Sequence, residues 1–203
     1  MDPRSMRSRQ LLRDALATTL DTLPFERITV VLLTKRAGVN RSTFYQHYAT
    51  TSDLLIDLVN VRLDETGLAE FDPFELDISS EQPPEFVTKL TDFVESARPI
   101  YVSKLTTSAQ NTLCVQFMAH LSSVFTHVLA CRKPDYVSPL VFISAPALAG
   151  SITGPIWAWL QDPDPPAKED MEGWLWKVIR LALRTRQERY MAREGCPGPV
   201  SLN

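Results

Sequence analysis

Six polar side chains within one short segment have the chemistry needed to read a nucleic acid. All can form hydrogen bonds with base edges or phosphates, and no Asp or Glu stands among them. On one helix, they would form a polar face of a width that fits the DNA major groove, where donor and acceptor patterns distinguish all four base pairs. The six residues are Arg41, Ser42, Thr43, Tyr45, Gln46 and His47.

Two short helices are predicted to hold these side chains in place. Thr29 precedes the segment VVLLTKRA, which ends at Gly38, a residue type favoured where a helix takes a left-handed C-terminal cap. Asn40 can cap a second helix that runs from Arg41 to about Tyr48. This spacing is that of a helix-turn-helix. The shared core is predicted to come from Leu33, Ala37, Val39 and Phe44.

Further helices are predicted on both sides of this pair. Residues 7–23 have leucines at spacings of three and four, which indicates an amphipathic helix that ends at Pro24. Thr50 is expected to cap the next helix, with Asp53 in its first turn. That helix is predicted over Ser52 to about Glu65.

The charge of the chain is unevenly distributed. Residues 1–50 hold eight Arg and Lys against four Asp and Glu, a balance of +4 within a total of −3. The other 153 residues therefore carry −7. A basic N-terminal segment on an acidic body is typical of a phosphate-binding module joined to a domain with another role.

At these residues the chain closely resembles the TetR family of transcriptional repressors, over about residues 8–60. The resemblance rests on Thr29 at the first motif helix, the AGV turn, the helix STFYQHY and the DLL that opens the following helix. It implies a face of Arg41, Thr43, Tyr45, Gln46 and His47 toward DNA, with Tyr45 and His47 mainly positioning. It also implies that Thr29 caps its helix and touches a phosphate. The predicted DNA-binding set is Thr29, Arg41, Ser42, Thr43, Tyr45, Gln46 and His47.

The chain departs from the family pattern at Thr51, where the family often has a lysine. A neutral side chain there removes one charged phosphate contact, so affinity for DNA and its salt dependence should be lower. This departure favours an alternative, a TetR-like helical interaction protein whose DNA-binding head is degenerate.

The predicted fold is all-α, because no segment shows the alternating pattern of a strand. Residues 1–51 are expected to form a three-helix DNA-binding domain, and residues 52–203 a helical ligand-binding and dimerisation domain. The segment Phe71–Pro84, rich in Pro, Ser and acidic residues, is predicted to be a loop. Because Pro99, Pro134 and Pro139 are taken as breaks, the later helices are expected near 85–97, 100–107, 109–131, 138–160 and 168–191.

The last two predicted helices have the apolar faces of a dimer interface. The resemblance implies that they pair with their copies in a second subunit as a four-helix interface, which makes the chain a homodimer. Two apolar faces on one helix pair exceed what a single chain is expected to cover. The residues assigned to this interface are Ile152, Ile156, Trp159, Leu160, Met171, Trp174, Leu175, Val178 and Ile179.

A ligand pocket is predicted among the central helices. The family resemblance implies that a small-molecule effector enters there, shifts the helix over Ser52 to Glu65 and moves two DNA-binding heads out of register. Aromatic side chains suit an apolar ligand. The pocket is assigned to Phe93, Tyr101, Phe117, His120 and Phe142.

Other functional classes are less well supported. His120, His127 and Cys131 share helical spacing, but no second cluster completes a metal site, so no metal or cofactor is expected. The segment Gly150–Gly154 lacks the lysine of a phosphate-binding loop, and no enzymatic activity is expected. With no run of about 18 apolar residues, no signal segment and no paired cysteine motif, the chain is expected in the cytoplasm without a membrane partner. The expected partners are operator double-stranded DNA, a second copy and an effector.

Overall fold

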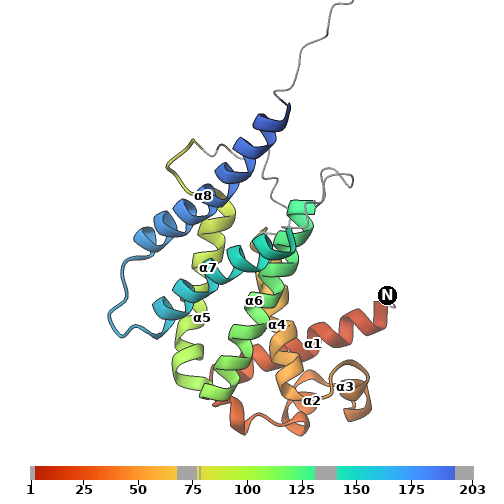
Figure 1. Cartoon of the computed structure of the whole chain (residues 1–203). Helices are drawn as coiled ribbons and strands as arrows, with labels where there is room; N and C mark the ends of the chain where they lie inside the picture. The colour runs from red at the N-terminus through yellow and green to blue at the C-terminus, as the bar shows by residue number, and fades with distance from the viewer. Residues whose placement is uncertain (1–2, 68–76, 78, 131–140, 195–203) are drawn as a thin grey trace, which may run out of the picture.

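All regular structure in the described residues is helical, which confirms the predicted all-α fold (Figure 1). The computed structural model describes residues 3–67, 77, 79–130 and 141–194. Its α-helices are α1 Pro3–Leu20, α2 Val30–Ala37, α3 Arg41–His47, α4 Thr51–Asp64, α5 Glu85–Lys104, α6 Thr107–Ala130, α7 Val141–Gln161 and α8 Lys168–Glu194, with one 3₁₀ turn at Phe25–Arg27.

The first three helices pack around one small core at one end of the molecule (Figure 1). Leu12 and Leu16 of α1 meet Leu33 of α2 and Phe44 of α3, and each of these four side chains is fully buried. Their spacing on α1 is the predicted leucine pattern. The helix itself ends at Leu20, earlier than expected, and in the turn that follows the backbone N–H groups of Thr22 and Leu23 both donate to the Thr19 carbonyl.

Helix α4 connects this head to the rest of the chain. It begins at Thr51 with the predicted cap: the Thr50 hydroxyl accepts from the Asp53 N–H, and the Asp53 carboxylate accepts from the Thr50 N–H. Helix α4 packs against α1 of the head and against α5 and α6 in the rest of the chain. Movement of α4 would therefore change the packing in both parts of the molecule.

The body consists of α5 to α8, with α6 and α7 in the most extensive contact. The predicted break at Pro99 is wrong, since α5 runs through it without interruption. A proline inside a helix loses one backbone hydrogen bond and crowds the preceding turn. Here Leu90 and Val94 before it, and Tyr101 after it, are buried in the same core, so packing holds both halves in one helix.

The boundaries of the remaining helices are close to expectation. Helices α6, α7 and α8 start and end within a few residues of the predicted segments. Pro134, Pro139 and half of the predicted loop Phe71–Pro84, residues 71–76 and 78, lie outside the described residues, while the described half, residues 77 and 79–84, is not helical. Within the described part of the chain, none of the helices has both the length and the apolar character that crossing a bilayer requires.

Candidate nucleic-acid interface

Local backbone geometry forms the helix-turn-helix as predicted. The Thr29 hydroxyl accepts a hydrogen bond from the Leu32 N–H at 3.2 Å and so caps α2. Gly38 ends α2 with φ of +66°, a left-handed conformation that glycine adopts without the strain of a side chain. Asn40 stands at the predicted cap position of α3, but its side chain makes no capping hydrogen bond. The buried side chain of Phe44 therefore contributes more than the Asn40 cap to holding α3 in place.

Phe44 anchors the inner side of α3. Its side chain is fully buried, and its ring contacts Tyr45 edge-on at 5.5 Å and Tyr48 at 5.7 Å between centroids. Tyr45, by contrast, is 53% exposed. The predicted DNA-binding side chains Arg41, Ser42, Gln46 and Thr29 are exposed as well, while Thr43 and His47 are half-buried. The polar face of α3 is thus open to a partner along most of its length.

His47 is held by α1 within the chain. Its Nε2 atom lies 2.8 Å from the Ser8 hydroxyl, and its ring packs edge-on against Tyr48. Such contacts orient the end of α3 relative to α1, which fits the positioning role that the family resemblance implies for His47. Thr51, the residue in place of the family lysine, is the half-buried first residue of α4.

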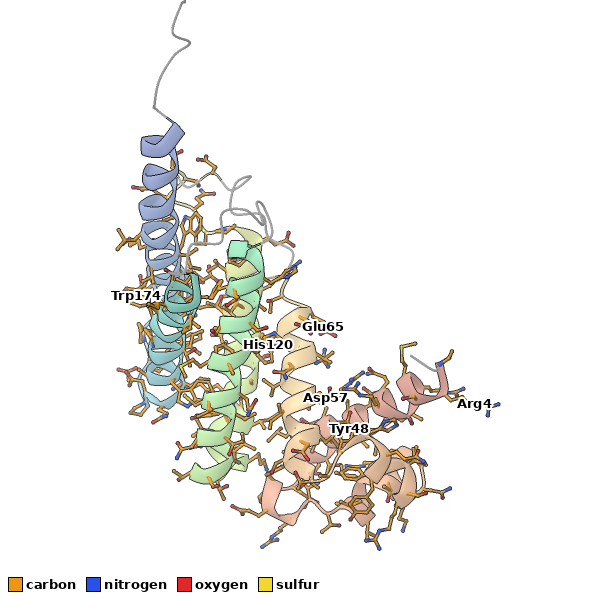
Figure 2. The ribbon with its side chains drawn as sticks, turned by 45° about the vertical axis from the view of Figure 1, so that its right-hand side comes forward. Arg4, Tyr48, Asp57, Glu65, His120 and Trp174 are labelled. Atoms are coloured by element: carbon orange, nitrogen blue, oxygen red, sulfur yellow. The ribbon has the colours of Figure 1, made fainter. Side chains whose placement is uncertain are left out.

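A charged cluster that sequence reasoning missed joins α1, α3 and α4. Asp57 of α4 accepts a hydrogen bond from the Tyr48 hydroxyl at 2.6 Å and from Arg13 at 2.9 Å, and it also pairs with Arg9 (Figure 2). Tyr48 follows directly after α3, and both arginines belong to α1. Asp57 thereby fixes the end of the predicted recognition helix to the helix that leads into the body.

The electrostatics of this cluster favour a charged Asp57 and a neutral Tyr48. Burial of Asp57 works against its charge, but the hydrogen bonds from Tyr48 and Arg13 and the charges of both arginines outweigh it, so its pKa is lowered. Burial of Tyr48, together with the negative charge that it faces, raises the pKa of its hydroxyl to about 12. The cluster therefore keeps these protonation states across the neutral pH range.

The cluster also changes which basic residues are available for DNA. Arg9 and Arg13 are two of the eight cations in the predicted basic segment, and both neutralise Asp57 inside the protein. Arg27, Lys35 and Arg41 remain exposed around the helix-turn-helix. The charge that can face phosphates is consequently smaller than the net charge of residues 1–50 indicates.

Comparison with solved structures identifies the fold. The TetR-family repressor AlkX from Dietzia sp. strain DQ12-45-1b, implicated in biodegradation of n-alkanes, matches with a TM-score of 0.56 and 16% identity over 91% of this chain and 97% of that chain. The chain has the TetR fold. The dihydroxyacetone kinase operon activator DhaS matches with a TM-score of 0.53 and 14% identity, over 89% of this chain and 97% of its own.

A third structure agrees with this assignment. A TetR-family transcriptional regulator from Streptomyces coelicolor matches with a TM-score of 0.50 and 13% identity, over 93% of this chain and 86% of that chain. No protein-family model matches the sequence, and no curated protein matches it. The shared feature is thus the arrangement of helices.

On this TetR fold, most residues assigned to a dimer interface lie in the core of their own chain. Seven of them are at most 6% exposed, so they have no surface left for a second subunit to cover. The apolar periodicity marks the inward side of each helix. The exposed exception is Trp174, at 42%, on the side of the molecule away from α4 (Figure 2). The seven are Ile152, Ile156, Trp159, Leu160, Met171, Leu175 and Ile179, while Val178 is half-buried.

The outward face of α7 and α8 carries different residues. Ala147, Ser151, Gly154 and Ala158 recur on α7 at spacings of three and four, and all are exposed. A Cβ atom at Gly154 would meet no atom of its own chain within 4 Å. These four residues and the exposed Trp174 of α8 are together called the outer face of α7 and α8.

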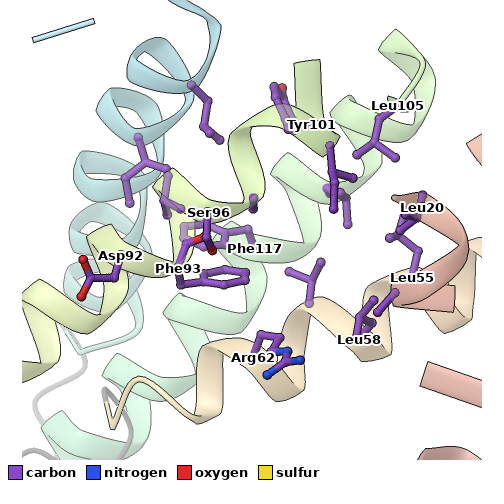
Figure 3. Close-up of a pocket in the computed structure, with 18 of the residues that line it drawn as sticks. Leu20, Leu55, Leu58, Arg62, Asp92, Phe93, Ser96, Tyr101, Leu105 and Phe117 are labelled. Atoms are coloured by element: carbon purple, nitrogen blue, oxygen red, sulfur yellow. The ribbon is translucent and has the colours of Figure 1, made fainter. Parts of the chain in front are cut away.

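A cavity of about 850 Å³ lies between the head and the body (Figure 3). Of the predicted pocket residues, Phe93, Tyr101 and Phe117 line it. His120 does not, because its Nε2 atom faces α4 and lies 3.1 Å from Asp64. The side chain of Phe142 lies outside the described part of the structure. Residues of α1 and α4 also line the cavity, a contribution that the sequence analysis did not predict.

The described residues contain no group of three or more His, Cys, Asp or Glu placed to hold a metal ion. His120 and His127 are both on α6, and Cys131 lies outside the described residues.

Proposed function

We propose that the chain is a cytoplasmic, non-enzymatic transcriptional regulator that binds operator DNA as a homodimer and is released by a small-molecule ligand. The observation that supports this best is the exposed polar face of α3, held outward by buried Phe44 on one side and by the Asp57 cluster at its end. A rigid helix with hydrogen-bonding side chains and no acidic residue suits the major groove.

Dimerisation is proposed through the outer face of α7 and α8. One recognition helix reads only a few base pairs, whereas two copies about one DNA turn apart read a near-palindrome. Small residues on α7 permit close approach of a second helix, and Trp174 supplies a large apolar side chain that is 42% exposed in the single chain. A symmetric pair would bury this face twice.

Release by a ligand is proposed through α4. Leu55, Leu58 and Val59 of α4 line the cavity, and their neighbour Asp57 holds the end of α3. A ligand that binds one position of α4 better than another would shift the spacing of two heads. AlkX is described as a repressor and DhaS as an operon activator. We propose repression, and expression of a reporter gene placed under the operator will show whether the protein represses or activates transcription.

The DNA-binding step is tested with the full chain and a pool of random duplexes. Selection should enrich a near-palindromic sequence, and binding of that duplex, followed by fluorescence anisotropy, should weaken as salt is added. Tyr45→Ala should weaken binding of the duplex at least tenfold without changing the oligomeric state, because the substitution removes an exposed side chain from the proposed recognition face.

The matched control is Val115→Ala, which truncates a side chain of similar exposure on α6. It should bind the duplex like the unchanged protein. Selection that enriches no sequence, or equal affinities of the Tyr45→Ala and Val115→Ala variants, would contradict the proposal. Such a result would favour an interaction protein with a degenerate head.

A further inference from the structure

The cavity is long and lies along two helices. On α5 its lining runs from Lys89 to Tyr101, twelve residues apart, which corresponds to about 18 Å at the rise of an α-helix. On α4 it runs from Leu55 to Arg62, and it continues to Glu65 and Thr66 just beyond that helix. Figure 3 shows Asp92 toward one end, Leu20, Leu55 and Leu105 toward the other, and Arg62 between them, beside Phe93. The cavity thus suits an elongated occupant.

Much of the cavity lining is hydrocarbon and aromatic. It includes Phe93 and Ile100 of α5 and Leu58 of α4. Phe117 and Trp157 also line it, with ring centroids 5.8 Å apart, and the rings of Tyr101 and Trp157 pack edge-on with centroids 5.2 Å apart. A ligand in contact with these side chains gains free energy by burying apolar surface.

The hydroxyl groups along the cavity already have partners within the protein. Ser96 donates to the Phe93 carbonyl at 2.8 Å and Thr66 to the Leu63 carbonyl at 2.7 Å, while the Tyr101 hydroxyl accepts from Gln161 at 3.3 Å. In the described part of the chain, the single buried side-chain nitrogen or oxygen without a hydrogen-bond partner is Arg13 Nε, outside the cavity. A polar group buried in the middle would therefore lose its water, and among these three hydroxyls Tyr101 alone makes no hydrogen bond as a donor.

The charged side chains that line the cavity are all exposed. Arg62, Glu65, Lys89 and Asp92 are each about half exposed and paired with a charge on the protein surface. Asp21, also exposed, follows Leu20 at the end of the cavity away from Asp92. A polar or charged end of a ligand can keep its hydration beside these side chains, and both signs of charge are present.

We infer that the cavity binds an elongated, lipid-like molecule. Its hydrocarbon body lies between α4 and α5 against Phe93 and Phe117, and its polar group stays in water beside the exposed charges of Arg62 and Lys89. This inference identifies the ligand class of the proposed function and depends on that function only for its effect on DNA. Recognition comes from the length of the hydrocarbon, because the charged side chains near the polar group are exposed and already paired on the protein.

The test is calorimetric titration of the DNA-free full chain with straight-chain carboxylates from octanoate to tetradecanoate, each below its micellar concentration. Affinity should rise about fourfold with each added methylene while the chain is shorter than the cavity. Decanoate, decanol and decylamine should bind within about tenfold of one another. Binding that does not change with chain length, or no binding by any member, would overturn the inference.

Two variants locate the binding site. Ala97→Phe adds a ring to a residue that lines the cavity and should abolish binding, whereas Ala119→Phe adds the same ring at an exposed position on α6 and should leave it intact. Thermal melts establish that both variants are folded. Equal binding by the two folded variants would overturn the inference, and the chain-length series tests it independently if Ala97→Phe does not fold.

The effect on DNA is read separately, by adding tetradecanoate to the complex with the selected duplex. Release of the duplex supports both the ligand class and the proposed function. Chain-length-dependent binding without release supports the ligand class and contradicts the release step of the proposed function.

Discussion

Asp57 is the residue whose removal tests most sharply how α3 is held. Asp57→Asn keeps the size of the side chain but removes the negative charge between Arg9 and Arg13. Arg13, whose side chain is only 13% exposed, would then be a largely buried cation without a counter-charge. We expect α3 to lose its fixed position against α4, although no residue of the DNA-facing side is changed.

The size of the effect follows from the burial of the pair. Breaking a fully buried ion pair costs about 3–5 kcal/mol, and an exposed one about 0–1 kcal/mol. With Asp57 16% and Arg9 31% exposed, an intermediate cost of about 2 kcal/mol is expected. The loss of DNA affinity reaches about thirtyfold when this cost leaves the head of the free variant mostly displaced, so that binding must restore its ordered position. The melting temperature of a chain of this size should fall by about 4–8 °C.

Anisotropy titrations with the selected duplex measure the loss, and Asp14→Asn is the matched control. Asp14 is an exposed residue of α1 that accepts a hydrogen bond from Gln10. Both substitutions remove one negative charge near the head, so by long-range electrostatics alone each should strengthen DNA binding slightly. Only Asp57→Asn should weaken it. Equal affinities of the two variants would refute the positioning role of Asp57, and so would an unchanged melting temperature.

Two further predictions concern the dimer and the pH dependence of stability. Gly154→Arg should convert the proposed dimer to monomers in sedimentation experiments, because the new side chain has room on its own chain but obstructs the outer face of α7 and α8. Ser108→Arg, at an exposed position on α6, should leave the proposed dimer intact, and a dimeric Gly154→Arg variant would count against that interface. Tyr48 has a pKa of about 12 in the folded chain against an ordinary value of 10, so its contribution to stability is complete below pH 10 and is lost as the pH rises toward 12. Urea unfolding at high pH should accordingly show a smaller loss of stability for Tyr48→Phe than for the unchanged protein, and identical losses would exclude this role for the hydroxyl.

The head was predictable because its signals are local. Thr29 caps α2 through the N–H of a residue three positions later, and Gly38 turns the chain through its own backbone angle. Phe44 is the apolar side chain on an otherwise polar segment, so its burial followed from the pattern. Each of these features depends on residues that are close in sequence.

The features that depend on distant residues were not predictable. Arg9, Arg13 and Asp57 each look like ordinary surface charges, and only the packing of α1 against α4 brings them together. Periodicity on α7 and α8 correctly marked buried faces. It could not tell a face buried in its own chain, such as that of Ile156 and Leu175, from one left for a partner.

The most direct test of the central claim is site-specific photocrosslinking from the face of α3. A photoreactive residue replacing Gln46 should crosslink to bases of the selected duplex, and one replacing Gln116, exposed on α6, should not. Crosslinks from position 46 to bases in both half-sites of the duplex would agree with two copies of α3 in successive major grooves. Crosslinks from position 116 but none from position 46 would contradict the claim that α3 reads DNA.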